Sequence, residues 1–332
     1  MTILLGVTFL VALAFDFTNG FHDTANAIAT SISTRAMSAR QAVLLSAVLN
    51  LVGAVVTVVF FGSAVSNTIA KLVPEPTLVV IIAALIGAIA WNLLTWYLGL
   101  PSSSTHAFVG GLIGAAIAAG GGFGAVHWGE VLKVALGLVI SPPIGFAAAF
   151  ACMLALYALA RHGRPGPLNT GFRRLQILTA AFVSYSHGSN DAQKSMAAMT
   201  LALVATGHLH HFAVPIWVVV LAALAIAFGT YAGGWRIIKT LGYRIYKLEP
   251  ATGMGAQLMS AAVIQVGTHF GFPVSTTHVV TGAVMGAGAP RRLSAAGWGV
   301  GANILAAWVL TIPAAAIIGW VALAILHTGG VR

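Results

Sequence analysis

Two polar stretches lie within apolar sequence, and their residue types could bind ions. The first is Asp16-Phe-Thr-Asn-Gly-Phe-His-Asp23-Thr-Ala-Asn26, and the second is Ser184-Tyr-Ser-His-Gly-Ser-Asn190-Asp191-Ala-Gln193-Lys194. Aligning their glycines places Asp23 on Asp191, 168 residues further along the chain. Carboxylates flanked by hydrocarbon-facing sequence are unfavourable, and they usually mark an ion or substrate path. The pattern therefore predicts a path for a charged solute across a membrane.

Side-chain oxygens of these stretches suit a hard cation or a shared proton. Asp23 and Asp191 are the first candidates for binding or relaying a coupling ion, and Asn19, Asn190 and Asp16 lie beside them. Asp16 has the weakest claim, because the second stretch has a serine in its place. The alternative is a buried hydrogen-bonded network that only fixes the helices, and both roles can hold together.

A second pair of motifs consists of Pro101-Ser-Ser-Ser-Thr-His106 and Pro273-Val-Ser-Thr-Thr-His278. A half-helix that begins at each proline directs free N–H groups and its positive dipole end at whatever lies there. Two such ends that converge near the membrane midplane would form an anion site, suited to tetrahedral oxyanions such as phosphate or sulfate. The alternative is plain helix packing. The candidate hydroxyl donors are Ser103, Ser104, Thr105, Ser275, Thr276 and Thr277.

Lys194 makes the two polar stretches unequal, because the first stretch has Asn26 at the matching position. Its ammonium could take the place of a cation beside Asp191, which would leave coupling to protons or to a cation bound in the first half only. Alternatively Lys194 contacts the anion, together with Asn26 and Gln193. His106 and His278 could relay protons near neutral pH or only orient a neighbour.

The composition indicates an all-α integral membrane protein. Hydrophobic residues make up 59% of the 332 residues and charged residues only 7%, against roughly 25% charged in soluble domains. Many apolar runs approach the roughly 20 residues that cross a bilayer as a helix. We expect the lipid bilayer as its surroundings. Residues 3–15 and 24–34 are predicted to be half-helices joined by a break at Asp16–Asp23, and 175–206 a similarly broken span.

Several classes of protein are excluded by the same composition. The basic residues form short clusters rather than the stripe that nucleic acid requires, so no nucleic-acid partner is expected. One cysteine cannot make a thiolate metal site, and no histidine pair has the helix-face spacing of a metalloprotease. Because no catalytic constellation is evident, we predict no enzyme, no cofactor and no metal site.

An internal repeat organises the chain. Asp23 matches Asp191, the two proline-hydroxyl motifs match each other, and Pro142 matches Pro313, in the same order and with offsets of 168, 172 and 171 residues. We predict a first transmembrane repeat at 1–160, a cytoplasmic basic linker at 161–174 and a second repeat at 175–332. About five spans each would make the repeats inverted in topology, although 103–119 and 275–288 could instead be re-entrant hairpins.

The charges predict an orientation. Twelve of the 16 basic residues fall in connections on one side, and the positive-inside rule makes that side cytoplasmic with both termini outside. Three others, Lys71, Lys133 and Arg332, fall on the opposite side. The twelve are Arg35, Arg40, Arg161, Arg164, Arg173, Arg174, Arg236, Lys239, Arg244, Lys247, Arg291 and Arg292.

The motifs resemble the paired signatures of the inorganic phosphate transporter (Pit) family. These are Asn19-Gly-Phe-His-Asp23-Thr-Ala-Asn26-Ala, His187-Gly-Ser-Asn190-Asp191-Ala-Gln193-Lys194 and the two Pro-x-Ser-Ser/Thr-Thr-His segments, and the resemblance covers essentially the whole chain. It implies uptake of inorganic phosphate driven by a cation gradient, through an inverted-repeat core that forms a homodimer.

The second motif departs from the Asn-Asp-x-Ala-Asn-Ala form of sodium-coupled members. It resembles the bacterial low-affinity form, which implies proton coupling and transport partly as a neutral complex of phosphate with a divalent metal. We therefore expect a proton-coupled phosphate symporter in the plasma (inner) membrane of a prokaryote. Sodium coupling and a sulfate substrate remain alternatives, and an anion channel, which would dissipate gradients rather than accumulate solute, is a third.

Overall fold

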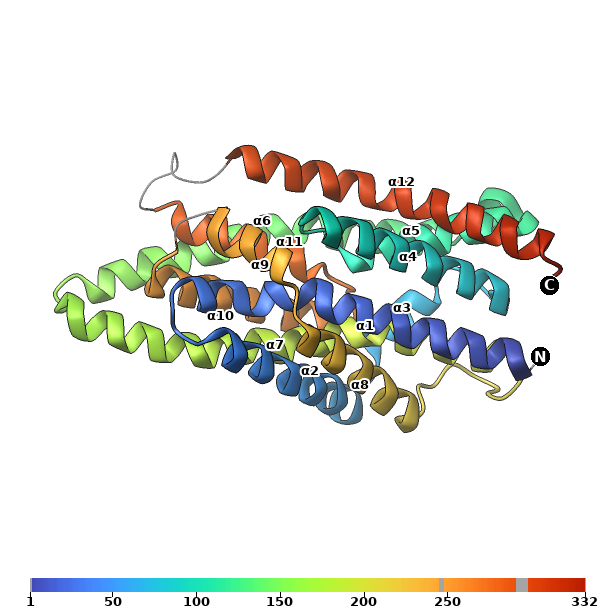
Figure 1. The fold of residues 1–332 in the computed structure, drawn as a ribbon, viewed down its shortest axis with the longest axis horizontal. Coiled ribbons are helices and arrows are strands. Elements are labelled where there is room, and N and C mark those ends of the chain that lie inside the picture. The colour runs from blue at the N-terminus through green and yellow to red at the C-terminus, as the bar shows by residue number, and fades with distance from the viewer. Residues whose placement is uncertain (1, 245–247, 291–297, 332) are drawn as a thin grey trace.

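Long helices run the length of the molecule in both halves of the chain (Figure 1). The computed structural model describes residues 2–244, 248–290 and 298–331. Within them lie α1 (Thr2–Ser33), α2 (Ala39–Phe61), α3 (Ala64–Ala70), α4 (Leu78–Leu98), α5 (Ser104–Ala116), α6 (Trp128–Ala160), α7 (Pro165–Ala205), α8 (Ile216–Ala232), α9 (Trp235–Lys239), α10 (Pro250–His269), α11 (Thr276–Gly288) and α12 (Trp298–Thr328). Short π-helical or 3-10 segments follow α5 (Ile117–Gly121 and Gly122–Ala125) and α9 (Thr240–Arg244).

The helix breaks predicted in the two polar stretches are wrong. Helix α1 continues through Asp16–Asp23 without a break, and α7, which is 41 residues long in total, continues through Asp191. An unbroken helix satisfies its own backbone hydrogen bonds where water is absent. The polar side chains are instead accommodated by neighbouring helices, because the positions from Thr18 to Asn26 that carry them are buried.

Glycines in these stretches allow close helix packing. A Cβ at Gly20 would overlap the α8 backbone at Ile226, and a Cβ at Gly188 would overlap the α2 backbone at Asn50. The contact is reciprocal: Gly229 of α8 meets the backbone of α1, and Gly53 of α2 meets that of α7. The sequence pattern that suggested a break therefore marks a close approach of two backbones.

The two halves of the chain interlock. Helices α1 to α6 correspond in order to α7 to α12, and the contacts cross between the halves: α1 packs on α8, α2 on α7, α5 on α12 and α11 on α6. In Figure 1, α1 runs away from the end that holds the N-terminus, whereas α7 runs back towards it. Both termini lie at one end of the bundle, and the connection between α6 and α7 lies at the other.

The connection between the halves is shorter than the predicted linker at 161–174. Helix α6 ends at Ala160 and α7 begins at Pro165, so residues 165–174 form the first turns of α7. Proline is well suited to this position, because the first N–H of a helix has no intrahelical partner.

Helices α5 and α11 begin inside the bundle. Each has 13 residues, which gives about 20 Å of helix against a hydrocarbon thickness of about 30 Å. The N–H of His127 donates to the carbonyl of Leu72 at 3.0 Å, so the chain returns after α5 to the end where it entered α4. The α4–α5 segment is therefore a re-entrant hairpin rather than a pair of crossings. The α10–α11 segment has the same interior start and similar helix lengths, 20 and 13 residues against 21 and 13.

The hairpin turns have the same design in both halves. Gly99 ends α4 in the left-handed conformation (φ 67°), and Gly271 has a φ of 73° shortly after α10. Pro101 and Pro273 follow and prevent the helix from resuming. Each half thus has four long helices and one short helix that begins inside the bundle, which is the re-entrant alternative predicted for 103–119 and 275–288 rather than five full crossings in each half.

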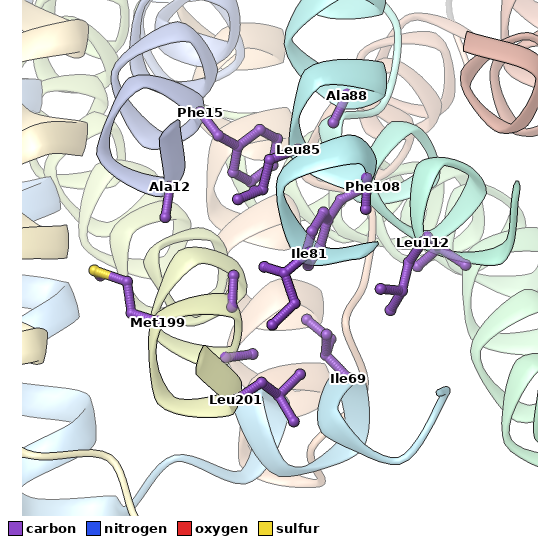
Figure 2. Close-up of a cluster of buried hydrophobic side chains, with 14 of the residues drawn as sticks. Ala12, Phe15, Ile69, Ile81, Leu85, Ala88, Phe108, Leu112, Met199 and Leu201 are labelled. Carbon is purple, nitrogen blue, oxygen red and sulfur yellow. The ribbon is translucent and has the colours of Figure 1, made fainter. Parts of the chain in front are cut away.

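An apolar core holds the first hairpin against α1 and α7. Figure 2 shows Phe15 of α1, Ile81 and Leu85 of α4, and Phe108 of α5 packed together, and the Phe15 and Phe108 rings are 5.3 Å apart. Five of the described helices are long and apolar enough to cross a membrane, namely α1, α2, α4, α6 and the Ile304–Thr328 part of α12; the bent pair formed by α8 with Trp235–Tyr243 would make a sixth. Helix α7 is longer than any of these but carries buried polar residues.

Replacing Gly188 by alanine tests the close approach. We expect Gly188→Ala to lower the free energy of unfolding by about 1–3 kcal/mol, because the new methyl group would overlap the Asn50 carbonyl. Gly171→Ala is the matched control in the same helix, where nothing lies within 4 Å, and helix propensity alone should make it neutral or slightly stabilising. Thermal unfolding of both variants in detergent measures the difference, and equal melting temperatures would contradict this packing.

Candidate functional site

The first turns of α5 and α11 meet in the interior. The hydroxyl of Ser103 caps α5 by accepting the His106 N–H at 3.2 Å, and that of Ser275 caps α11 by accepting the His278 N–H at 3.3 Å. The Thr105 hydroxyl reaches the Val274 carbonyl at 3.5 Å. The two helix starts that were predicted to converge are therefore adjacent, with their hydroxyl groups buried.

Asp23 of α1 links the two helix starts. Its Oδ2 accepts the Ser104 hydroxyl of α5 at 3.1 Å, and its Oδ1 accepts the Thr277 hydroxyl of α11 at 3.3 Å. The Nδ1 of His22 lies 2.6 Å from Oδ1. A carboxylate thus lies where the positive ends of two helices point, which is a favourable position for a negative charge.

Lys194 of α7 lies on the other side of the same hydroxyl groups. Its Nζ is 3.0 Å from Asp191 Oδ2, donates to the Ser104 hydroxyl at 2.7 Å and reaches the Thr105 hydroxyl at 3.5 Å. The side chain is fully buried. The sequence left open whether Lys194 pairs with Asp191 or contacts the anion. Its ammonium lies against both the Asp191 carboxylate and the hydroxyl groups predicted to bind the anion.

Asn19 and Asn26 complete the cluster from α1. With its amide nitrogen directed at Asp23, Asn19 donates to Oδ2 at 3.0 Å, and its oxygen accepts from Lys194 at 3.3 Å. Asn26 donates to the hydroxyl of Thr277 at 2.9 Å and to that of Thr276 at 3.4 Å. Asn26 thus engages α11, much as Lys194 engages α5.

Asp23, His187 and Asp191 form the one group in the described part of the chain whose ligand atoms, all within 4.8 Å of one another, could hold a metal ion. His187 Nε2 lies 3.2 Å from Asp191 and 3.9 Å from Asp23, while its Nδ1 contacts Asn50 at 2.9 Å. The Lys194 ammonium already pairs with Asp191, and it would repel a divalent cation bound there. The geometry therefore fits a single positive charge better than a resident metal.

Three predicted residues lie apart from the helix starts. Asp16 accepts a hydrogen bond from the Ser195 hydroxyl of α7, and Asn190 donates to Thr268 at 2.8 Å and to a backbone carbonyl. Gln193 accepts the backbone N–H groups of Val65 and Ser66 at the start of α3. These contacts are those of helix packing, and within the described part of the chain the hydrogen bonds of these three side chains do not reach α5 or α11.

His106 and His278 point away from the carboxylates. Their rings are 4.6 Å apart, and the His278 ring stacks on Trp308 of α12 at 3.8 Å. Both histidines line a cavity of about 640 Å³ between α6 and α12. Both belong to the first turns of α5 and α11, where their backbone N–H groups are the ones that Ser103 and Ser275 cap.

Two site histidines, His22 and His187, were not included among the residues predicted from the sequence. The first motif reads Asn-Gly-Phe-His-Asp and the second His-Gly-Ser-Asn-Asp, so histidine and asparagine exchange places. His187 precedes Asp191 by four residues, the spacing that brings two side chains together on one helix face. That spacing was the signal available in the sequence.

The fold and the site together define a membrane transporter. Two corresponding halves whose first helices run in opposite directions (Figure 1), short helices that begin in the interior and a buried polar cluster between them are typical of secondary transporters. The family model described as "Phosphate transporter family" matches the chain twice, over residues 19–168 and 160–319. The chain belongs to the phosphate transporter family, and the double match agrees with the internal repeat.

Similar proteins extend over the whole chain. A protein of Bacillus subtilis is 47% identical over 98% of this chain and 99% of its own length, and one of Rhizobium meliloti is 46% identical over 93% and 92%. Both carry the name "Probable low-affinity inorganic phosphate transporter". A solved structure titled "The sodium-dependent phosphate transporter" has a TM-score of 0.90 and 27% identity, with 99% of this chain and 100% of that one covered.

Removing the Lys194 charge tests the buried ion pair. We expect Lys194→Met to lower the free energy of unfolding by about 3–5 kcal/mol, because it leaves the Asp191 carboxylate buried without its partner. The double variant Lys194→Met/Asp191→Asn removes both charges and should recover most of the loss. Thermal unfolding in detergent measures all three proteins, and a double variant no more stable than Lys194→Met would contradict the pairing.

Proposed function

We propose that this protein is a secondary active transporter that takes up inorganic phosphate together with a cation, most directly a proton. The proposal is carried by one observation: a buried lysine and a buried carboxylate contact hydroxyl groups at the two interior helix starts. The Ser104 hydroxyl lies 2.7 Å from Lys194 Nζ and 3.1 Å from Asp23 Oδ2. Family membership supports phosphate as the transported anion.

The anion would bind between α5 and α11. Each helix start offers backbone N–H groups and a partial positive charge, and the hydroxyls of Ser104, Thr105, Thr276 and Thr277 add donors. Lys194 would supply the one full positive charge, and Asn26 an amide donor from the opposite side. Ser103 and Ser275 would keep the helix starts in place, since their hydroxyls accept N–H groups of their own helices.

Proton coupling is supported by the inequality of the two carboxylates. The Lys194 ammonium lies 3.0 Å from Asp191 and takes the position that a bound cation would need there. Three residues after Asp23 the first half has Asn26, where the second half has Lys194 after Asp191. No lysine on α1 therefore pairs with Asp23, and Asp23 would be the group that binds a coupling ion. A proton fits this position because His22 and His187 flank Asp23 and can exchange protons with it.

Sodium coupling is the second candidate, and one observation favours it. The solved structure that superimposes on the whole chain is titled a sodium-dependent phosphate transporter. In that case the oxygens of Asp23 and its neighbours would bind the ion in the first half only, because Lys194 would still exclude one from the second. Asp16 and Asn190 would then hold the helices that shape this position.

The remaining features of the proposal concern the setting of the protein. The α1–α2 and α6–α7 connections lie at the end of the bundle opposite both termini (Figure 1). Arg35 belongs to the first of these connections and Arg40 to the first turn of α2, so the positive-inside rule would make that end cytoplasmic. We propose a prokaryotic plasma membrane as the location, two repeats separated near residues 161–174, a homodimer as the assembly and a divalent metal–phosphate complex as one form of the substrate.

Imposed gradients distinguish the coupling ions. Purified protein is reconstituted into proteoliposomes, and uptake of radiolabelled phosphate is followed under a proton gradient or a sodium gradient alone. We expect accumulation above equilibrium with protons only. A strict sodium requirement would contradict proton coupling, and equilibration without accumulation would indicate an anion channel.

Replacing Asp191 by asparagine tests the role of the second carboxylate. We expect Asp191→Asn to abolish gradient-driven accumulation, because the substitution changes the charge balance around Lys194 on which alternate binding of ion and anion depends. Uptake is normalised to the amount of protein in the membrane, and the double variant Asp191→Asn/Lys194→Met, which leaves no unpaired charge, controls for misfolding. Full accumulation by Asp191→Asn would exclude the residue from coupling.

A further inference from the structure

We infer that Asp23 selects for oxyanions that carry a proton, so that the site accepts hydrogen phosphate and rejects fully deprotonated tetrahedral anions such as sulfate. The inference rests on the proposed function, since it takes the two interior helix starts as the anion site, and while the anion is bound it places the coupling proton between the P–OH group and the Asp23 carboxylate. It concerns the substrate class of that site, which the composition and the helix starts alone leave open between phosphate and sulfate.

Asp23 is placed among the anion donors rather than beside them. Its two oxygens accept hydroxyl groups from both helices, Ser104 at 3.1 Å and Thr277 at 3.3 Å. The carboxylate is 2% exposed, so water cannot readily replace a hydrogen bond that it loses. Any anion bound by these hydroxyls must therefore lie against a negatively charged acceptor.

Each hydroxyl has a single hydrogen to donate. In this structure Ser104 and Thr277 give theirs to Asp23. When a bound oxyanion takes those hydrogens, each Asp23 oxygen is left with one donor fewer, and a buried acceptor without a partner is unfavourable. His22, 2.6 Å from Oδ1, continues to serve one oxygen. The oxygen that faces Ser104 keeps the Asn19 amide at 3.0 Å but loses its hydroxyl donor, and a hydrogen bond from the substrate itself can replace that donor.

Phosphate can supply that hydrogen bond and sulfate cannot. Inorganic phosphate keeps at least one P–OH group near neutral pH, and this group can donate to a carboxylate. Sulfate has lost both protons, so against Asp23 it would leave acceptors facing acceptors and bring two negative charges together. A site whose buried polar groups hydrogen-bond one group of the substrate rejects analogues without that group far more strongly than an apolar pocket does.

The equivalent carboxylate in the second half cannot have this role. Asp191 Oδ2 lies 3.0 Å from the Lys194 ammonium and 3.2 Å from His187, so its charge is balanced locally. Among the described residues, no hydrogen bond joins Asp191 to a hydroxyl of α5 or α11. Selection is therefore assigned to one half of a repeated structure, and the two carboxylates provide a matched comparison.

The test measures anion selectivity of Asp23→Asn against Asp191→Asn. Purified proteins in lipid nanodiscs bind radiolabelled phosphate, and three unlabelled competitors are titrated: phosphate, sulfate and monofluorophosphate. Monofluorophosphate keeps the phosphorus but has fluorine in place of the P–OH group, so at neutral pH it has no proton to donate. It separates recognition of the proton from recognition of the element.

We expect the wild-type protein to bind sulfate and monofluorophosphate at least about 100-fold more weakly than phosphate. Asparagine at position 23 can turn its amide N–H towards the anion, so Asp23→Asn should bring all three anions within about tenfold of one another. Asp191→Asn changes the charge beside Lys194, so it should change the affinity for all three anions by a similar factor and leave their ratios as in the wild type. A ratio is obtained from a single preparation, so partial unfolding of a variant lowers the amount bound without changing the selectivity.

Three outcomes would overturn the inference. Wild-type protein that binds sulfate or monofluorophosphate as well as phosphate would mean that Asp23 is neutralised before the anion binds. Selectivity unchanged in Asp23→Asn, or lost equally in Asp191→Asn, would remove the special role of the first carboxylate. In these cases phosphate binding and the proposed function would stand. Wild-type protein that binds none of the three anions would overturn the proposed function as well.

Discussion

Helices that begin in a water-poor interior impose the main constraint on this structure. The first N–H groups of α5 and α11 have no intrahelical acceptor, and in a membrane they need partners from the protein or a ligand. Ser103 and Ser275 satisfy one N–H group each. The partial positive charge at both helix starts is balanced by the nearby Asp23 carboxylate. That charge in turn stabilises a carboxylate whose burial in the membrane would otherwise be unfavourable.

The two halves meet this constraint in different ways. Three residues after its carboxylate, the first half has Asn26 and the second half has Lys194. The asparagine donates to α11 and carries no charge, whereas the lysine donates to α5 and pairs with Asp191. A repeated fold therefore holds an asymmetric cluster, in which one carboxylate pairs with a buried lysine and the other accepts hydroxyl groups of both interior helix starts.

The sequence predicted the members of the site better than the shape of the helices that carry them. Paired motifs at matching offsets identified Asp23, Asp191 and the hydroxyls of α5 and α11, because a repeat places equivalent residues around one axis. The breaks expected in α1 and α7 were wrong, since Gly20 and Gly188 serve packing against α8 and α2 rather than a turn. Contacts of that kind depend on a partner distant in the chain, and no local pattern reveals them. The same reason explains why Gln193 was grouped with the anion donors although it binds the start of α3.

The interlocking of the halves restricts how access to the site could alternate. Helix α5 lies against α12 so closely that a Cβ at Gly110 or Gly114 would overlap the α12 backbone, and Gly282 and Gly286 of α11 approach α6 in the same way. Each hairpin is thus joined to the last helix of the opposite half. Moving one sequence repeat as a rigid body would separate these backbones, because small residues at a helix interface stabilise it through close van der Waals contact. We therefore expect the moving unit to combine a hairpin with the last helix of the other half, and the anion site to lie where the two such units meet.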